Sequence, residues 1–226
     1  MFSILAFGSL SIYLASPHAP LKTIIMPRIL PVLPLLLAAV SQAPVFSADP
    51  SKLVAGKSLE QTASDLENSD RVVRLRAVRS LGVYGEPAGE ILQAALEHED
   101  RAVRYLAAEQ LGQLGGDSLK AAESKLESLA ADDSSLSVQM AASFALCRAG
   151  KIDQHLPLLI RTLTYPERGT ACSAAALIGK IGPQAEKAIA PLEAMHQKHR
   201  AGVKGGDYHR GGAAMNALRK ISDKYN

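Results

Sequence analysis

The sequence predicts an all-α protein, an α-solenoid (an α-α superhelix) of about five helical hairpins. The first reason is a short residue pattern that recurs five times along the chain, because repeats at such a period are typical of stacked hairpins. The second reason is composition. The chain is 47% hydrophobic and 4% aromatic, with no Trp. Few aromatic residues beside abundant Ala and Leu favour packed helices over sheets.

The N-terminal 48 residues are predicted to be a leader. Arg28 precedes an apolar run over residues 29–40, and small residues follow up to Ser47 and Ala48. A positive start, a short apolar stretch and small residues at a cleavage site are the layout of a secretory signal peptide, here residues 26–48. We expect cleavage after Ser47 or Ala48.

Residues 1–25 contain a second apolar run, and Met26 stands directly before the complete signal peptide. We therefore interpret residues 1–25 as an extension upstream of the true start. The alternative is an uncleaved membrane anchor, which needs about 20 apolar residues. Pro31, Pro34 and the shortness of the run favour cleavage.

Five segments downstream share one pattern of apolar, Ala and Gly positions. They run from Val73 to Gly85, Val103 to Gly115, Val138 to Gly150, Thr170 to Gly182 and Arg210 to Ser222. Successive segments are about 30 to 40 residues apart.

Each position of the pattern has a physical interpretation. Val73, Ala77, Leu81 and Tyr84 lie four, four and three residues apart, which makes one apolar stripe on a helix. The recurring Ala predicts a close neighbouring helix. The closing Gly predicts a helix stop in the left-handed conformation. The first element of each hairpin is called helix A below.

Second apolar helices, called B, are predicted between the A helices. They are centred on 91–96, 119–130, 156–163 and 189–195, with an initial helix at 59–66. Asp70 and Asp100 stand where an N-cap belongs, and Pro166 lies near the start of the fourth A helix. Residues 49–58 are the predicted linker, and residues 59–226 are the predicted solenoid.

The second segment, Val-Arg-x-x-Ala-x-x-x-Leu-Gly-x-Leu-Gly from Val103 to Gly115, resembles the short bacterial HEAT repeats, including phycobilisome-lyase-like ones. The resemblance covers residues 59–222. It implies HEAT-type hairpins whose B helices line a concave binding face. The third segment departs from the pattern at Cys147, and a longer insertion precedes the fifth.

The charge balance argues against nucleic acid as the main partner. The net charge is +3, and Lys22 and Arg28 of the leader contribute two of those charges. A nearly neutral body lacks the excess of cations that phosphate binding requires.

Two histidine groups were weighed as metal sites. His98-Glu99 resembles the His-Glu pairs of di-iron HEAT-repeat hydroxylases, but such a site needs several pairs, and we favour a polar turn. His196, His199 and His209 with Asp207 could supply ligands. The basic residues among them favour a solvated loop instead. No metal or cofactor is predicted.

The A helices are rich in arginine, with six in the first two segments. These are Arg71, Arg74, Arg76, Arg79, Arg101 and Arg104. Some are expected to pair with acidic groups between repeats. A solvated charged face is favoured over a patch for an anionic partner.

The two cysteines, Cys147 and Cys172, are predicted to be free thiols. Cys147 occupies the column of Gly179, and Cys172 lies seven residues earlier in its own helix. Parallel neighbouring A helices would hold their Cα atoms roughly 14 Å apart, beyond the reach of a disulfide at about 7 Å.

The sequence shows no Ser-His-Asp spacing, nucleophile elbow, phosphate loop or CxxC motif, so no catalytic residue is predicted. The leading hypothesis is a non-enzymatic scaffold, periplasmic or secreted, that binds another protein through its concave face. It is expected to be monomeric and to meet a membrane only through an uncleaved leader. The candidate binding residues, chosen from the phase of the B helices, are Gln93, Glu97, Glu123, His155 and Arg161.

Two other functions stay open. The stretch from Gly206 to Arg219 resembles the closing repeats appended to secreted hydrolases such as sulfatases, which implies a detached accessory module. A bilin-lyase-like enzyme subunit is the third. The leader argues against it, because phycobilin attachment is cytosolic.

Overall fold

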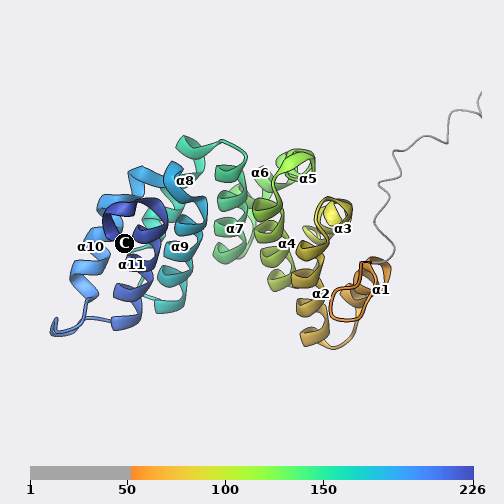
Figure 1. Cartoon of the computed structure of the whole chain (residues 1–226), viewed down its shortest axis with the longest axis horizontal. Coiled ribbons are helices and arrows are strands. Elements are labelled where there is room, and N and C mark those ends of the chain that lie inside the picture. Colours follow the sequence, from red (N-terminus) through yellow and green to blue (C-terminus); the bar gives the residue numbers. More distant parts are fainter. Residues whose placement is uncertain (1–51) are drawn as a thin grey trace, which may run out of the picture. The chain divides into compact units, whose positions relative to one another are not determined.

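The computed structural model describes residues 52–226, which form a row of stacked α-helices (Figure 1). The predicted leader and residues 49–51 of the predicted linker lie outside the described residues. Residues 52–58, the rest of that linker, contact the first hairpin. The Tyr84 hydroxyl donates to the Lys57 carbonyl at 2.6 Å, and Lys52 Nζ donates to the Val83 carbonyl at 2.6 Å.

The helices lie in two layers. The A layer contains α2 (Arg71–Tyr84), α4 (Arg101–Leu114), α7 (Leu136–Arg148), α9 (Arg168–Ile181) and α11 (Tyr208–Ile221). The B layer contains α1 (Leu59–Ser64), η1 (Asp65–Glu67), η2 (Glu86–Ala88), α3 (Gly89–Ala95), α5 (Gly116–Ala121), α6 (Glu123–Asp132), α8 (Ile152–Thr162), η3 (Gly182–Ala188) and α10 (Ile189–His199). A short turn, η4 (Asp223–Tyr225), follows α11.

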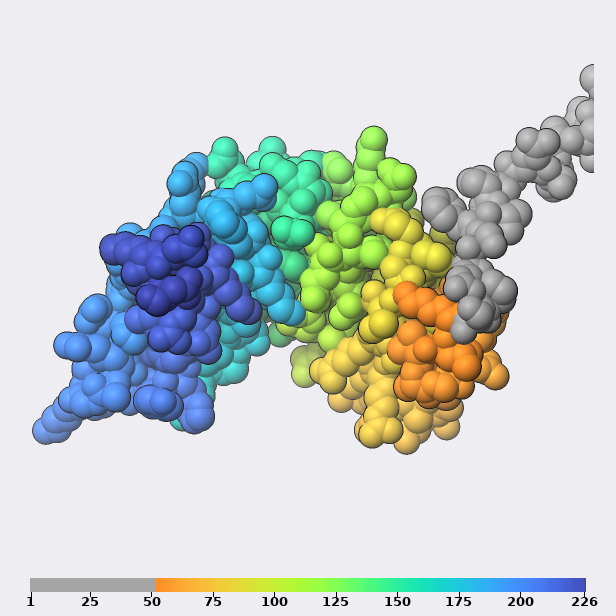
Figure 2. All heavy atoms as spheres, in the orientation of Figure 1, coloured from red at the N-terminus to blue at the C-terminus, as the bar shows by residue number. Residues whose placement is uncertain are grey.

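The all-α solenoid is confirmed. Between residues 52 and 226 the only β pairing is an isolated bridge from Val54 to Lys57. Successive A helices pack side by side, and the colours of Figure 2 follow one another in sequence order along the visible face of these residues. Each hairpin therefore packs mainly on its neighbours, as expected of a repeat array.

The B helices differ in which A helix they pack on. The sequence suggested A followed by B, and α8 packs more extensively on α7 than on α9, as that frame expects. In contrast, α3 packs more extensively on α4 than on α2, and α10 packs mainly on α11. Counted as B followed by A, the residues from 59 onwards contain five hairpins, beginning with α1–α2 and ending with α10–α11.

The A helices start as the sequence predicts. The side chains of Asp70 and Asp100 accept hydrogen bonds from the first turn of α2 and α4, and Asp207 does the same for α11. The third and fourth A helices differ, because the side chains of their N-caps, Ser135 and Glu167, make no capping bond.

The closing glycines end the A helices, but not in the predicted left-handed conformation. Gly85, Gly115 and Gly182 have φ between 71° and 80° and ψ between −146° and −149°. This region is open essentially to glycine alone. It redirects the chain sharply, so that a short turn or helix (η2, α5 or η3) precedes the main B helix in three hairpins.

Successive A helices also approach each other closely at a second column, which contains glycine. The Ala column is buried, with Ala107, Ala142 and Ala174 at 0% exposure. A Cβ added to Gly112 would lie 2.9 Å from the Cα of Ala145 in the next A helix. The residue after the aliphatic position therefore limits the spacing between helices.

The hydrophobic core consists of two clusters that meet at α7. Val138 and Leu146 belong to the cluster formed with α1–α6, while Met140 and Phe144 belong to the cluster formed with α8–α11. Every residue of α7 from 140 to 147 is buried. Within residues 52–226, none of the helices is both long and apolar enough to cross a membrane.

Candidate functional site

The five predicted binding residues all belong to the B layer. Gln93 lies in α3, Glu97 just after it, Glu123 in α6, and His155 and Arg161 in α8. Glu97 and Arg161 are exposed, and the other three are half-buried.

Two of these residues take part in ion pairs that cross from one hairpin to the next. Glu97 pairs with Lys125 of α6 at 2.8 Å. Glu123 and Glu127, one helical turn apart in α6, both pair with Lys151 at the N-cap of α8. The structure therefore joins Glu97 and Glu123 through α6.

The same arrangement continues one hairpin further, where Asp153 of α8 pairs with Lys187 of η3 at 2.6 Å. We call these charged residues the B-helix band. It consists of Glu97, Glu123, Lys125, Glu127, Lys151, Asp153 and Lys187. Gln93 and Arg161 make no ion pair with any residue between 52 and 226.

Sequence reasoning missed most of the band. It named Glu97 and Glu123, but not Lys125, Glu127 or Lys151. The available signal was the spacing of Glu123 and Glu127, which puts two carboxylates on one helix face with a lysine at the start of the next B helix.

His155 lies beside the band. Burial lowers the pKa of its ring, the Lys151 cation lowers it further, and the Glu127 carboxylate opposes both. The ring is therefore neutral at pH 7. The pKa of Glu127 is lowered by its bond to Lys151, so both partners of that pair are charged.

The ion pairs of the B-helix band are weak enough for a charged partner to replace one of their members. Its members are partly or largely solvent-exposed, and exposed ion pairs contribute about 0–1 kcal/mol each. A charged group on another molecule can replace one partner of such a pair at little free-energy cost.

The arginines of the A layer have a different role. Arg71 bonds to Asp100 at 2.7 Å and holds the pKa of that carboxyl well below its usual range. Arg104 bonds to Asp133 at 2.8 Å. Arg168 bonds to Asp207 of the following A helix at 2.6 Å. These bonds link successive hairpins, as expected for some of the arginines.

Arg74 is half-buried and also pairs with Asp100, at 3.5 Å. The other three arginines of the first two A helices are solvated. Arg76, Arg79 and Arg101 are exposed and form no ion pair with the part of the chain that the structure describes.

The histidines are engaged by backbone groups. Nδ1 of His98 accepts the N–H of Asp100 at 2.9 Å, and Nδ1 of His199 accepts the N–H of Asp207 at 3.1 Å. Nδ1 of His196 donates to the Gly211 carbonyl at 2.9 Å. No group of three or more potential ligands gathers as a metal site among residues 52–226.

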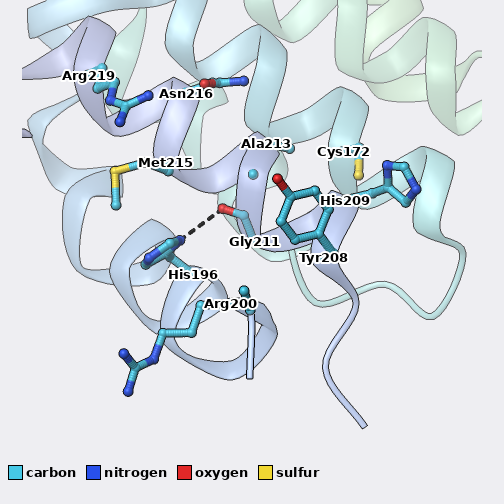
Figure 3. Close-up of a pocket in the computed structure, with 12 residues that line it drawn as sticks. Cys172, His196, Arg200, Tyr208, His209, Gly211, Ala213, Met215, Asn216 and Arg219 are labelled. Atoms are coloured by element: carbon cyan, nitrogen blue, oxygen red, sulfur yellow. Dashed lines mark hydrogen bonds between the residues drawn. The ribbon is translucent and has the colours of Figure 1, made fainter. Parts of the chain in front are cut away.

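A cleft lies around α11 at the end of the row, where side chains from α9, α10 and α11 meet (Figure 3). Its volume is about 770 Å³. The sequence pointed to this region through its histidines and through the resemblance of residues 206–219 to closing repeats, but not as a cleft.

The repeats can be compared with known families once this geometry is in place. Residues 59–147 match the family model described as HEAT repeats. The chain contains HEAT repeats over these residues. HEAT repeats are a general type of scaffold for protein–protein interaction, because stacked hairpins present extended surfaces.

A comparison with curated proteins found no match to this chain. Among solved structures, an engineered protein is similar at 20% identity and a TM-score of 0.45, covering 76% of this chain and 81% of its own. The complex of CpcE and CpcF of phycocyanin lyase from Nostoc sp. PCC7120 is similar at 23% identity and a TM-score of 0.45, covering 81% and 72%. These likenesses carry no statement about function.

Proposed function

We propose that this chain is an exported, non-enzymatic scaffold that binds another protein through the B-helix band. The observation that carries the proposal is the run of ion pairs across α3, α6, α8 and η3. It is a continuous charged surface in which each pair is weak enough to exchange with a partner's charges.

The B-helix band provides both signs of charge in a fixed order. Glu97 and Lys125 face each other at the first junction, and Glu123, Glu127 and Lys151 do so at the second. A partner with complementary charges gains specificity from this order, since a wrong register places like charges together. Gln93, His155 and Arg161 supply neutral and cationic contacts beside it.

Export rests on the predicted signal peptide. The protein would then meet its partner in the periplasm or outside the cell, as a monomer, and would contact a membrane only if the leader stays uncleaved. The alternative partner class is a secreted, sulfatase-like hydrolase to which this chain would be a detached accessory module. A bilin-lyase-like subunit is the least favoured function.

Export is tested by N-terminal sequencing of the full chain recovered from the exported fraction. We expect the mature chain to begin at Ala48 or Asp49. Recovery of the uncut chain in a membrane fraction would support the anchor instead.

Partner binding is tested by affinity capture from the exported fraction with three forms of the chain. One is unchanged, one carries Lys125→Glu with Lys151→Glu, and the control carries Arg76→Glu with Arg79→Glu on exposed positions of α2. We expect one protein, identified by mass spectrometry, to bind the unchanged and control forms and to be lost from the band variant. Equal capture by all three forms would exclude the band, and a single dominant hydrolase would select the accessory role.

A further inference from the structure

The cleft around α11 is a hollow surface separate from the B-helix band. Side chains from three helices line it, so that it exists only in the folded stack (Figure 3). The residues that enter the argument are Arg200, Arg219, His196, His209, Tyr208 and Met215. A volume of about 770 Å³ lies within the usual range of ligand sites, about 300–1,000 Å³.

The titratable side chains of the cleft are cationic or neutral. Arg200 and Arg219 are exposed, and neither pairs with a carboxylate among the residues that the structure describes. No Asp or Glu lines the cleft. Burial raises the pKa of the Cys172 thiol, so this side chain adds no negative charge.

Two carboxylates on the helices that line the cleft already pair with cations. Asp207, which caps α11, bonds to Arg168 at 2.6 Å and lies 3.8 Å from Arg210. Glu193 of α10 pairs with Lys224 at 3.5 Å. The two cleft arginines are thus left without an internal counter-charge between residues 52 and 226.

Gly211 and Gly212, two successive glycines of α11, line the floor of the cleft. Helix packing requires a glycine only at position 211. A Cβ at Gly211 would lie 2.5 Å from the His199 carbonyl, so glycine is needed there for α11 to cross the end of α10. A Cβ at Gly212 would meet nothing within 4 Å. Glycine inside a helix is destabilising by about 0.5–1 kcal/mol relative to alanine. Gly212 thus makes α11 less stable than alanine would, and its missing side chain leaves the cleft open.

Apolar groups border the cationic ones. Tyr208 is 71% exposed, which is unusual for a large aromatic side chain, and its ring lies edge-on to that of His209 with centroids 6.2 Å apart. Met215 is half-buried on the same helix. The cleft therefore combines two guanidinium groups with an aromatic and a thioether surface.

We propose that the α11 cleft binds an acidic peptide segment of a protein partner. Carboxylates of the segment bond to Arg200 and Arg219, whose planar guanidinium groups suit carboxylate geometry. An apolar side chain between the carboxylates packs on Tyr208 and Met215. The open floor at Gly212 admits the peptide backbone.

The test uses the full chain and two synthetic peptides in isothermal titration calorimetry at low salt. One peptide is Asp-Glu-Leu-Glu-Asp, and the other replaces every Asp and Glu by Asn and Gln. We expect the acidic peptide to bind and the neutral one to bind at least about tenfold more weakly. Equal binding of both, or binding of neither, would overturn the proposal.

Three variants locate the site. Arg200→Gln with Arg219→Gln should weaken binding of the acidic peptide by about tenfold or more, and Gly212→Leu should do the same by filling the cleft. Arg76→Gln with Arg79→Gln removes the same charge from α2 and should leave binding unchanged. Circular dichroism checks that each variant is folded, and Gly212→Val replaces the leucine variant if that variant is not.

Inorganic phosphate is the competitor that separates a peptide site from a general anion site. We expect phosphate at the same concentration as the peptide to leave peptide binding intact. Displacement by phosphate would overturn the peptide assignment. Because these measurements use variants outside the B-helix band, their failure would not bear on capture of a partner through that band.

Discussion

Different types of side chain accept the backbone N–H of the N-cap residue at the start of the A helices. The N–H of the N-cap residue is accepted by Asn68 before α2, by His98 before α4, by Asp133 before α7 and by His199 before α11. The sequence showed these residues only as polar turns. Their common role depends on the position of each ring or carboxylate relative to the backbone, which a single sequence does not display.

The histidine at this position makes the last hairpin sensitive to pH. Only the neutral ring of His199 can accept the N–H of Asp207, and its pKa is lowered by burial and by the Arg210 and Lys198 cations against the opposing Asp207 charge. A depressed pKa in the folded state means that the unfolded chain takes up the proton first. The contribution is complete above the ordinary histidine pKa of about 6.5 and is lost as the pH falls through the folded value.

We expect His199→Asn to remove the pH dependence of stability, because an asparagine, Asn68, accepts the N–H of the N-cap residue before α2. Between pH 7.5 and pH 5 the unchanged protein should lose up to about 1 kcal/mol more unfolding free energy than the variant. Urea unfolding at both pH values measures the difference. Equal losses would show that His199 does not act as the acceptor.

The two thiols should differ in reactivity. Both are free, as the sequence predicted, but Cys147 is fully buried and burial raises its pKa to about 12, while Cys172 is half-buried beside the α11 cleft. A thiol reagent at pH 8 should therefore label Cys172 in the native protein and reach Cys147 only through unfolding. Cys172→Ser should abolish the fast phase. Labelling of both thiols at one rate would contradict the packing of α7.

At the scale of elements, some A helices approach each other closely at a glycine that follows the aliphatic position. Gly82 and Gly112 are equivalent in the first two repeats, but they face different neighbours. A Cβ at Gly112 would press on the Phe144 ring at 2.7 Å and on the Ala145 backbone, while a Cβ at Gly82 would meet only the end of the Gln110 side chain.

This difference predicts opposite effects of the same substitution. Gly112→Ala should lower the unfolding free energy by about 1–3 kcal/mol, because backbone must move to admit the methyl group. Gly82→Ala should be neutral or stabilising by up to about 1 kcal/mol, since Gln110 can rotate away and alanine favours the helix. Thermal or urea unfolding compares the two. Similar destabilisation in both would mean that Gln110 is held as firmly as the α7 backbone.

At the scale of the whole described unit, α7 joins the two halves of the core. Phe144 belongs to the cluster of α8–α11 yet lies against Gly112 of α4. An ion pair between Glu109 of α4 and Lys180 of α9 also connects the helices on either side of α7. The Glu109–Lys180 pair links hairpins that are not sequence neighbours, which strengthens cooperativity beyond nearest-neighbour stacking.

Replacing Phe144 should therefore affect both halves. Phe144→Ala is expected to lower the unfolding free energy by about 3–5 kcal/mol and to reduce hydrogen-exchange protection in α4 as well as α9. Leu218→Ala, a buried position in the terminal helix α11, should reduce protection mainly in α10 and α11. If the Phe144 variant loses hydrogen-exchange protection on only one side of α7, the two clusters unfold independently.

The sequence by itself determined the helices, the N-caps Asp70 and Asp100, the glycine stops and the recurring hairpin, because these depend on interactions within a few residues. Asp100 caps α4 whatever the rest of the chain does, and a position such as Gly115 stops a helix through its own backbone freedom. Only the tertiary structure decided that Arg71 meets Asp100, that Lys151 meets two glutamates and that α9, α10 and α11 enclose a cleft. Those contacts depend on the angle and the offset between successive hairpins. Packing at residues such as Gly112 and Gly211 sets both quantities. Neither quantity can be read from a periodic pattern in the sequence.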